Sequence, residues 1–372
     1  MTDLAHEALA PGREAPGREA AVFDRIEAFR RRRPRLLDDV VTLAHGAGGK
    51  ASAALLDAVF LPALAPEDAG LQTDAAVVAL PSGERLAFST DSFVVKPLRF
   101  PGGSVGRLAV HGTVNDLAMM GARPVALSAA FVLEEGFSIE ALREIVADMA
   151  VAAAEVGAPI VTGDTKVVNH GAAEGVYIST SGIGLIPSGR AFAAERVSAG
   201  DAVIVSGTIA DHGMAVMLAR GDLMLESDIA SDSAPLYDLM ETLVAAAPST
   251  RWLRDATRGG VGTVCNELAR DSNLTVVLDE TALPVRPAVA AACELLGIDP
   301  LYVANEGKFV AVVAPDEAAS ALAALRGQDL GADAVQIGEI RAEPPGIVVL
   351  RTQLGGTRIV DMLVGDPLPR IC

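Results

Sequence analysis

From Val40 onward, apolar and polar positions follow two spacings in turn, one typical of strands and one typical of helices. Runs of continuous or alternating apolar residues such as 175–186 predict strands, and apolar positions three or four apart, as in 139–156, predict helices. The predicted helices cover about 51–60, 105–120, 139–156, 211–220, 288–296 and 316–325, with another opening at 255–260. The predicted strands cover about 40–43, 75–80, 86–90, 93–97, 125–132, 159–162, 175–186, 201–206, 274–278, 309–314, 335–341 and 347–351. This mixture predicts an α/β protein.

The order of these elements predicts two α/β domains of comparable size, neither of them a simple doubly wound sheet. Pro187-Ser188-Gly189-Arg190 is the best candidate for the linker, which gives an N-terminal domain at 39–188 and a C-terminal domain at 189–351. Residues 1–38 contain a doubled Ala-Pro-Gly-Arg-Glu and a run of arginines, and we expect them to form a mobile appendage. A translation start near Val40 or Val41 is a hypothesis that the mass of the natural protein would test. Residues 352–372 form a C-terminal tail.

Composition narrows the class of protein. The chain has 372 residues, 51% of them hydrophobic, and a formal net charge of −18. Such a charge argues against a general nucleic-acid surface and against anionic membranes, and it fits a cytoplasmic enzyme or partner protein. Long apolar stretches are all broken by charge, Gly or Pro, which predicts no membrane span.

The three cysteines form neither a disulfide framework nor a zinc motif. Cys265 and Cys293 lie in apolar helical patterns and are expected to be buried. The spacing of the histidines does not indicate a metal site either.

Short polar islands in the N-terminal half are the main candidates for chemistry. The segment Gly46-Ala47-Gly48-Gly49-Lys50 opens a predicted helix, where backbone N–H groups suit phosphate, although a plain tight turn explains it as well. It is not a Walker A loop, because alanines stand at 44 and 51. Four aspartates at strand ends or turns, flanked mostly by Thr, Ser or Asn, are Asp74, Asp91, Asp116 and Asp164. Each alone is better explained as a turn or cap residue, but four in one domain favour a Mg²⁺–nucleotide site.

Two further residues have two interpretations each. Lys166 follows Asp164 and can neutralise a transferring phosphoryl group, or it is a surface lysine. Glu306, in Asn305-Glu306-Gly307-Lys308, can be a general base or a turn residue, and the sequence alone favours neither. We interpret Asp255 with Gly259-Gly260 as a structural helix start rather than a catalytic group.

The last residue of the chain is Cys372. It follows Pro367-Leu368-Pro369-Arg370-Ile371, and the two prolines favour an extended backbone. A thiol on the last residue has no chain beyond it to pack, so it can reach into another site. On the tail alone an accidental residue at a frayed end is favoured. Together with the polar islands, we interpret the tail as a tethered thiol that is itself a substrate.

These motifs resemble a known family. His111-Gly112-Thr113-Val114-Asn115-Asp116-Leu117-Ala118-Met119-Met120-Gly121-Ala122 is similar to the central motif of the ATP-binding superfamily of aminoimidazole ribonucleotide synthetase, selenophosphate synthetase and thiamine-monophosphate kinase. In detail the chain resembles the hydrogenase-maturation HypE family, from about residue 40 to the end. The segments that match, in order, are 46–50, 89–93, 162–167, 211–214, 255–260, 305–308 and the terminal Pro369-Arg370-Ile371-Cys372. Residues 1–38 have no counterpart.

The resemblance implies a fold, an activity and partners. The implied fold has two domains, with N-terminal strands from two chains forming a barrel in a homodimer, a C-terminal α/β domain and a flexible tail. The implied activity uses ATP and Mg²⁺ to dehydrate a carbamoyl group on Cys372 to a thiocyanate, the source of cyanide ligands for [NiFe]-hydrogenase. The implied partners are the carbamoyltransferase HypF, which loads the thiol, and a HypC–HypD complex, which receives the cyanide.

The resemblance also implies roles for single residues. Asp74, Asp91, Asp116 and Asp164 hold the metal and nucleotide, with Asn115 assisting nearby. Gly46, Gly48 and Gly49 cradle phosphates. Lys166 stabilises charge at the carbamoyl group, and Glu306 accepts a proton.

Two rival functions remain at this point. One is an ATP-dependent synthetase or kinase for a free small molecule, whose catalysis would survive loss of Cys372. Selenophosphate synthetase is disfavoured among these, because no cysteine stands near the Gly loop. The other rival is a non-catalytic carrier that binds ATP as a structural ligand and presents the thiol.

Overall fold

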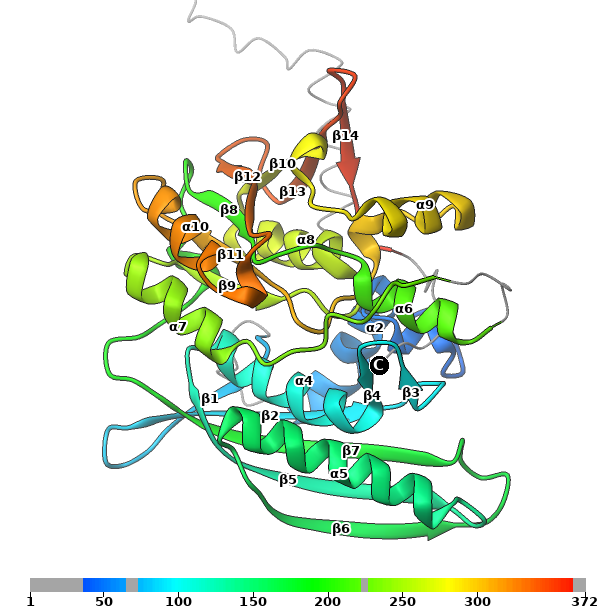
Figure 1. Ribbon diagram of the computed structural model, residues 1–372. Coiled ribbons are helices and arrows are strands. Elements are labelled where there is room, and N and C mark those ends of the chain that lie inside the picture. Colours follow the sequence, from blue (N-terminus) through cyan, green and yellow to red (C-terminus); the bar gives the residue numbers. More distant parts are fainter. Residues whose placement is uncertain (1–35, 65–72, 222–226, 364–372) are drawn as a thin grey trace, which may run out of the picture.

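The computed structural model describes residues 36–64, 73–221 and 227–363 (Figure 1). In this part of the chain two large sheets, each with helices packed on it, confirm the predicted two-part α/β architecture. No helix of the described residues is long and apolar enough to cross a membrane.

The first sheet has the strand order β1-β2-β7-β5-β6. Its strands are β1 (Ala76–Ala79), β2 (Arg85–Phe93), β5 (Arg123–Glu134), β6 (Ile160–Val168) and β7 (Val176–Ile186). Helices α4 (Val105–Met119) and α5 (Ile139–Val156) cover one face, and α5 is the crossover between the parallel strands β5 and β6. The cluster of buried apolar residues between them includes Phe93, Leu108, Leu127, Ile145 and Ile178. The opposite face carries exposed Phe88 and Ile183, so it lacks a covering layer within the described chain.

The second sheet has the order β14-β13-β10-β12-β8-β11-β9. Its strands are β8 (Ala202–Val205), β9 (Trp252–Asp255), β10 (Thr275–Asp279), β11 (Phe309–Val313), β12 (Val335–Arg341), β13 (Ile347–Arg351) and β14 (Thr357–Val360). Alternate residues of β8 and β11 enter two different cores. Val203 and Val310 pack with helix α8 (Gly260–Ser272), whereas Ile204 and Phe309 pack with α7 (Tyr237–Ala246) and α10 (Ala318–Arg326). Both faces are therefore covered, which explains the continuous apolar runs of these strands.

Helix α4 joins the two halves. It is buried along nearly its whole length, and its last residues Ala118 and Met119 belong to the core formed by α7 and α10 of the second half. On its other side, α6 (Asp211–Ala219) and α9 (Pro287–Leu296) contribute Met214 and Val289 to the core of the first half. Residues of α4 thus stand at the junction where a site between the two halves can form.

Smaller elements complete the described chain. The glycine-rich segment Gly46–Lys50, called the Gly loop, starts at the last residue of a 3-10 turn (Leu43–Gly46) and ends at the first residue of α2 (Lys50–Leu55). A π-helical turn (Leu56–Phe60) and α3 (Leu61–Leu64) follow. The two-residue strands β3 (Arg99–Phe100) and β4 (Gly103–Ser104) precede α4. The other 3-10 turns are Ala194–Arg196, Glu280–Ala282, Pro300–Tyr302 and Asp329–Gly331.

Several predicted elements were wrong or missing. The strand at 40–43 does not form; Val40 and Val41 are exposed and have no strand beside them. The strand at 93–97 is absent, because β2 runs through to Phe93 and ends there.

The segment 163–166, expected to be a loop, lies inside β6, which stays paired with β5 to Val168. Helix α6 begins at Asp211 as predicted, but it ends at Ala219, and Ala210 is its N-cap residue. Helix α7 and strands β3, β4, β9 and β14 were not predicted, and β14 comes from the segment expected to be tail.

Candidate functional site

Three carboxylates from distant parts of the chain meet where the two halves join. Asp74 precedes β1, Asp116 is in α4 and Asp255 ends β9, and each offers an oxygen within 4.8 Å of the others. The Ser89 hydroxyl donates a hydrogen bond to Asp116. The Asp255 Oδ2 atom is buried and has no hydrogen-bond partner among the residues that the structure describes. A buried carboxylate oxygen without a donor suits a cation ligand, and three carboxylates suit Mg²⁺.

Burial and mutual repulsion make the charged forms of these carboxylates unfavourable. Desolvation raises the pKa of Asp74 to about 6. The pKa values of Asp116 and Asp255 lie well above the usual range, first because of desolvation and then because of their acidic neighbours. Arg254 offsets part of this charge, with its Nε 3.0 Å from Asp74 Oδ1 and 3.2 Å from Glu267 Oε2. One guanidinium does not neutralise four carboxylates, so the site favours an added divalent cation.

We expect Mg²⁺ to stabilise the protein more at high pH than at low pH. An aspartate whose pKa is raised by folding contributes stability at low pH and loses it as pH rises through the folded pKa. For Asp74 that window runs from 3.8 to about 6, and for Asp116 and Asp255 it extends further upward. The rise in melting temperature on adding MgCl₂ should be larger at about pH 8 than at about pH 5. Equal shifts at both pH values would mean that these carboxylates do not bind the ion.

Asp91 lies beside the three carboxylates and connects them to the Gly loop. It is on β2, and desolvation raises its pKa. The Arg258 Nη2 atom is 3.5 Å from Asp91 Oδ1, and Arg258 Nη1 donates a 3.3 Å hydrogen bond to the Gly46 carbonyl. Gly48 has a φ of +78°, and a Cβ there would lie 3.0 Å from Arg258 Cβ. The loop predicted to cradle phosphates is therefore held at the edge of the acidic cluster.

The base of the C-terminal tail is bound to the same loop. The Lys50 backbone N–H donates a 3.0 Å hydrogen bond to the Leu363 carbonyl, and Lys50 Nζ is 2.8 Å from Asp361 Oδ2. The Tyr302 hydroxyl donates to the Asp361 carbonyl at 2.7 Å. A Cβ at Gly49 would lie 2.4 Å from the Leu363 oxygen, so glycine is needed for this approach. Cys372 lies outside the described residues, but the nine residues after Leu363 span at most about 30 Å.

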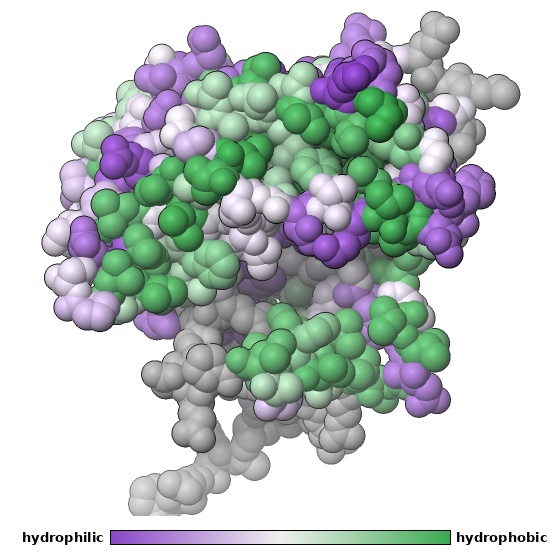
Figure 2. Space-filling model, turned by 90° about the horizontal axis from the view of Figure 1, so that it is seen from below, coloured by the Kyte–Doolittle hydropathy of each residue, from purple (hydrophilic) through white to green (hydrophobic). Residues whose placement is uncertain are grey.

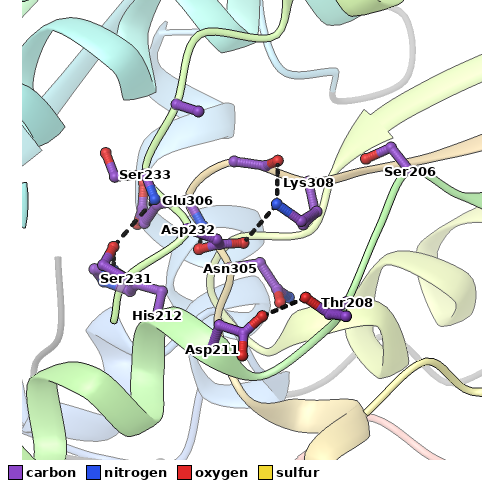
Figure 3. Close-up of polar contacts among 12 residues, drawn as sticks. Ser206, Thr208, Asp211, His212, Ser231, Asp232, Ser233, Asn305, Glu306 and Lys308 are labelled. Carbon is purple, nitrogen blue, oxygen red and sulfur yellow. Dashed lines mark hydrogen bonds and ion pairs between the residues drawn. The ribbon is translucent and has the colours of Figure 1, made fainter. Parts of the chain in front are cut away.

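Glu306 is buried in the loop before β11 (Figure 3), close enough to Asp255 and Asp91 to interact with them electrostatically. The residue is 3% exposed, and its pKa lies well above the usual range, first because of desolvation and then because of the negative charges of Asp255, Asp91 and Asp232. A raised pKa makes the carboxylate form of Glu306 a stronger proton acceptor.

Asn115 contacts protein rather than open space. Its Nδ2 donates to the carbonyls of Ala234 at 3.0 Å and Glu306 at 3.3 Å, and its Oδ1 accepts from the Leu236 N–H at 2.8 Å. Both amide donors and the acceptor are thus used within the chain. The structure therefore gives Asn115 a role in holding the Glu306 loop, and the nucleotide contact expected of it stays a prediction.

Asp164 and Lys166 are not brought to this cluster within one chain. Both are exposed on the edge strand β6, and Lys166 Nζ is 2.7 Å from Asp164 Oδ2. In the sheet register, Asp91 on β2 lies opposite Thr180 on β7, which lies opposite Ala129 on β5. Ala129 in turn lies opposite Gly163 on β6, the residue before Asp164. Three strand spacings therefore separate Asp91 from Asp164, about 14 Å. Ligands of a single Mg²⁺ lie about 2 Å from the ion, so these two aspartates of one chain do not share it.

Sequence reasoning missed Asp255, Arg254 and Arg258. Asp255 was interpreted as a helix start, but it ends β9 and belongs to the carboxylate cluster. The available signal was its position, since an aspartate between an apolar strand and a Gly-Gly pair resembles the other four polar islands.

Comparisons with known proteins agree with this arrangement. Residues 72–186 match the family described as AIR synthase related protein, N-terminal domain, and residues 198–351 match the corresponding C-terminal domain. The chain is 55% identical to carbamoyl dehydratase HypE of Rhodobacter capsulatus, over 91% of this chain and 99% of that protein. It is 46% identical to carbamoyl dehydratase HypE of Escherichia coli K12, over 89% and 99% respectively.

Solved structures give the same result. A structure of a HypE–HypF complex is similar with a TM-score of 0.78 and 46% identity, covering 83% of this chain and 100% of that one. A structure of hydrogenase maturation protein HypE in complex with ATP is similar with a TM-score of 0.75 and 44% identity, covering 90% and 100%. A structure of AaThiL complexed with AMPPCP and TMP has a TM-score of 0.63 at 18% identity, covering 84% and 96%, and this likeness concerns the fold alone.

Proposed function

This chain belongs to the carbamoyl dehydratase HypE family of the AIR synthase superfamily, and we propose that it dehydrates a carbamoyl group on its own Cys372 in an ATP-dependent reaction of hydrogenase maturation. The observation that carries the proposal is the hydrogen bonding of the tail base, Asp361 and Leu363, to the Gly loop beside the acidic cluster. A substrate thiol nine residues further along is within reach of that cluster.

The reaction is balanced with one ATP and one loaded thiol. The carbamoyl oxygen attacks the γ-phosphorus, the bond to ADP breaks, and one N–H proton leaves, which gives an imidate phosphate on sulfur. Loss of the second N–H proton forms C≡N as the C–O bond breaks and phosphate leaves. The products are a protein thiocyanate, ADP and phosphate. Phosphorylation is needed because the unmodified amide oxygen is a poor leaving group, and Glu306 is the proposed proton acceptor.

Asp74, Asp116 and Asp255 are the proposed Mg²⁺ ligands, with Asp91 beside them. Mg²⁺ bound there would neutralise phosphate charge during phosphoryl transfer. The loop of Gly46, Gly48 and Gly49 is the proposed phosphate cradle, and its link through Arg258 to Asp91 supports that role.

We assign Asp164 and Lys166 to the site of a second copy. Their place on an exposed edge strand, about 14 Å from Asp91 in the same sheet, favours a role at another chain's cluster. A homodimer joined through the first sheet, with strands of both chains forming a barrel, would bring them there. The uncovered face of that sheet supports this dimer, since Val78, Phe88, Val125 and Ile183 are each at least 38% exposed. Figure 2 shows apolar side chains spread over the molecule as seen from below.

We expect Ile183→Asp to convert the dimer to monomers. Ile183 pairs with Phe88 across β2 and β7, so a carboxylate there would be buried without a partner in the dimer. Sedimentation velocity measures the result. Val146→Asp, on the exposed side of α5 and 46% exposed, is the matched control and should leave the oligomeric state unchanged. An Ile183→Asp protein that remains dimeric would place the interface elsewhere.

The partners follow from the same family. A solved complex of HypE with HypF supports HypF as the carbamoyltransferase that loads Cys372. A HypC–HypD complex is the proposed acceptor of the cyanide, and the cytoplasm is the proposed location.

Intact-mass spectrometry of the protein incubated with HypF, carbamoyl phosphate, ATP and Mg²⁺ tests the function. We expect a gain of one carbamoyl group followed by loss of one water. ATP consumption on a free metabolite with no change of the tail would instead support a small-molecule synthetase or kinase. A carbamoylated tail that never loses water in the presence of ATP would support a thiol carrier.

A further inference from the structure

The segment Ser231–Leu236, named here the strap, crosses between α4 and the loop that holds Glu306 (Figure 3). Two buried histidines hold its first part. His212 Nδ1 lies 2.8 Å from the Ser231 hydroxyl, and His111 Nδ1 lies 3.1 Å from the Ser233 hydroxyl. Burial lowers the pKa of His111 to about 4, so this contact keeps one protonation state near neutral pH. Asn115 holds the second part, through the Ala234 carbonyl and the Leu236 N–H.

The strap contacts each of the residues Glu306, Gly307 and Lys308. Asp232 Oδ1 accepts a 3.0 Å hydrogen bond from the Glu306 backbone N–H, and Asp232 Oδ2 lies 3.5 Å from Lys308 Nζ. A Cβ at Gly307 would lie 1.8 Å from the Asp232 carbonyl oxygen, so the two backbones touch. The Asp232 side chain is 5% exposed and that of Lys308 is 9% exposed. This contact is therefore built into the interior rather than formed at the surface.

Glu306 is consequently held at both ends of its main chain by side chains from outside its own loop. Asp232 accepts from its N–H, and Asn115 donates to its carbonyl. Both of those side chains are themselves fixed, Asp232 by the strap and Asn115 by α4. The direction of the Glu306 Cα–Cβ bond follows from these two contacts, because they fix the peptide planes on either side of it.

We propose that Asp232 is a positioning residue for the dehydration, which places the Glu306 carboxyl against the reacting tail through the Glu306 backbone N–H. This inference rests on the proposed role of Glu306 as the proton acceptor. Proton transfer requires heavy atoms within hydrogen-bond reach, and a displacement of about 1 Å costs on the order of 10²-fold in rate.

A pair of variants separates geometry from charge at this position. Asp232→Asn keeps the length of the side chain and an oxygen for the Glu306 N–H, and loses the charge. Asp232→Glu keeps the charge and adds one methylene, which pushes the Glu306 loop away. We expect Asp232→Glu to slow conversion of the carbamoylated tail to the thiocyanate by about 10- to 100-fold. Asp232→Asn should stay within about threefold of the wild-type rate, because the hydrogen bond is preserved.

Single-turnover intact-mass kinetics on protein already carbamoylated by HypF measures this step alone. The KM for ATP and the rate of carbamoylation should be unchanged in both variants, since Asp232 touches neither the Gly loop nor the tail base. A general loss of structure would alter all three quantities. Asp232→Glu at the wild-type rate would overturn the proposal, and so would a slow Asp232→Asn beside a normal Asp232→Glu, which would indicate a role for charge.

The double variant Asp232→Glu/Glu306→Gln distinguishes this inference from the function on which it rests. If Asp232 acts through Glu306, the double variant should be no slower than Glu306→Gln alone, because residues that act as a unit are not additive. An additive loss would overturn the positioning role while leaving Glu306 as the base. Near-wild-type dehydration by Glu306→Gln itself would refute the base assignment, and the positioning role with it.

Discussion

In a Cys372→Ala protein we expect neither the carbamoyl adduct nor the thiocyanate, and ATP hydrolysis that depends on HypF and carbamoyl phosphate should fall to background. Removing a substrate atom leaves no alternative route, so this is the largest effect predicted here. The other two cysteines do not substitute for it. Cys265 and Cys293 are buried, and desolvation raises their thiol pKa values to about 12 and about 11, so neither forms a thiolate readily at neutral pH.

Cys293→Ala is the matched control for the tail variant. It removes a thiol of the same chemistry from the interior of α9, and it should be carbamoylated and dehydrated like the wild type. Intact-mass spectrometry after incubation with HypF, carbamoyl phosphate and ATP measures the carbamoyl adduct and the thiocyanate product in both variants. A carbamoyl adduct that persists in Cys372→Ala, or that disappears in Cys293→Ala, would refute the tail as the substrate.

Elements with strong local signals were predictable from the sequence. Helix α5 runs over the predicted Ile139–Val156, because Ser138 caps its first turn through the Ala141 N–H and Gly157 ends it with a φ of +66°. Apolar spacing and both end signals agree there, so no distant contact is needed to set the bounds. Strand β11 was predicted from a run of apolar residues, since both of its faces are buried.

Strand β6 shows where local signals fail. Its centre, Gly163-Asp164-Thr165-Lys166, has the composition of a loop, and every residue there is exposed. It is extended because β5 provides a continuous ladder of partners up to Glu134. Gly163 is required by a close approach, since a Cβ would lie 2.2 Å from the Ala129 carbonyl oxygen. Neither contact is visible in the residues of β6 themselves.

The sequence predicted the kind of site better than it predicted which residues form the site. The sequence named Asp74 and Asp116 because each sits in a polar island, and the structure brings these two together. The sequence offered no means of placing β9 beside α4, so Asp255 was not included among the predicted ligands. Asp164 has the same local pattern, but the sheet carries it three strands away from Asp91. Local composition therefore identifies candidate ligands, whereas sheet order decides which of them share an ion.

Asp255→Asn should abolish phosphoryl transfer while making the metal-free protein no less stable. The amide keeps the shape of the side chain but loses a carboxylate ligand, and charge stabilisation by a bound metal is worth several kcal/mol. We expect the ATP-dependent dehydration rate to fall by at least about 10³-fold. In the metal-free state the same change removes a buried charge whose pKa is raised by desolvation and by Asp74. The melting temperature without Mg²⁺ at about pH 8 should therefore equal or exceed that of the wild type.

Glu267→Gln is the control for this prediction, because Glu267 also neighbours Arg254 but lies outside the three gathered carboxylates. It should retain most of the wild-type rate. Thermal unfolding with and without MgCl₂, together with phosphate release, measures both arms of the prediction. An inactive Asp255→Asn that has also lost several degrees of stability would give Asp255 a structural role, because a purely structural carboxylate stabilises the fold. Loss of activity together with a gain in metal-free stability identifies a ligand, since Arg254 offsets only part of the repulsion among these carboxylates and a bound cation would offset the rest.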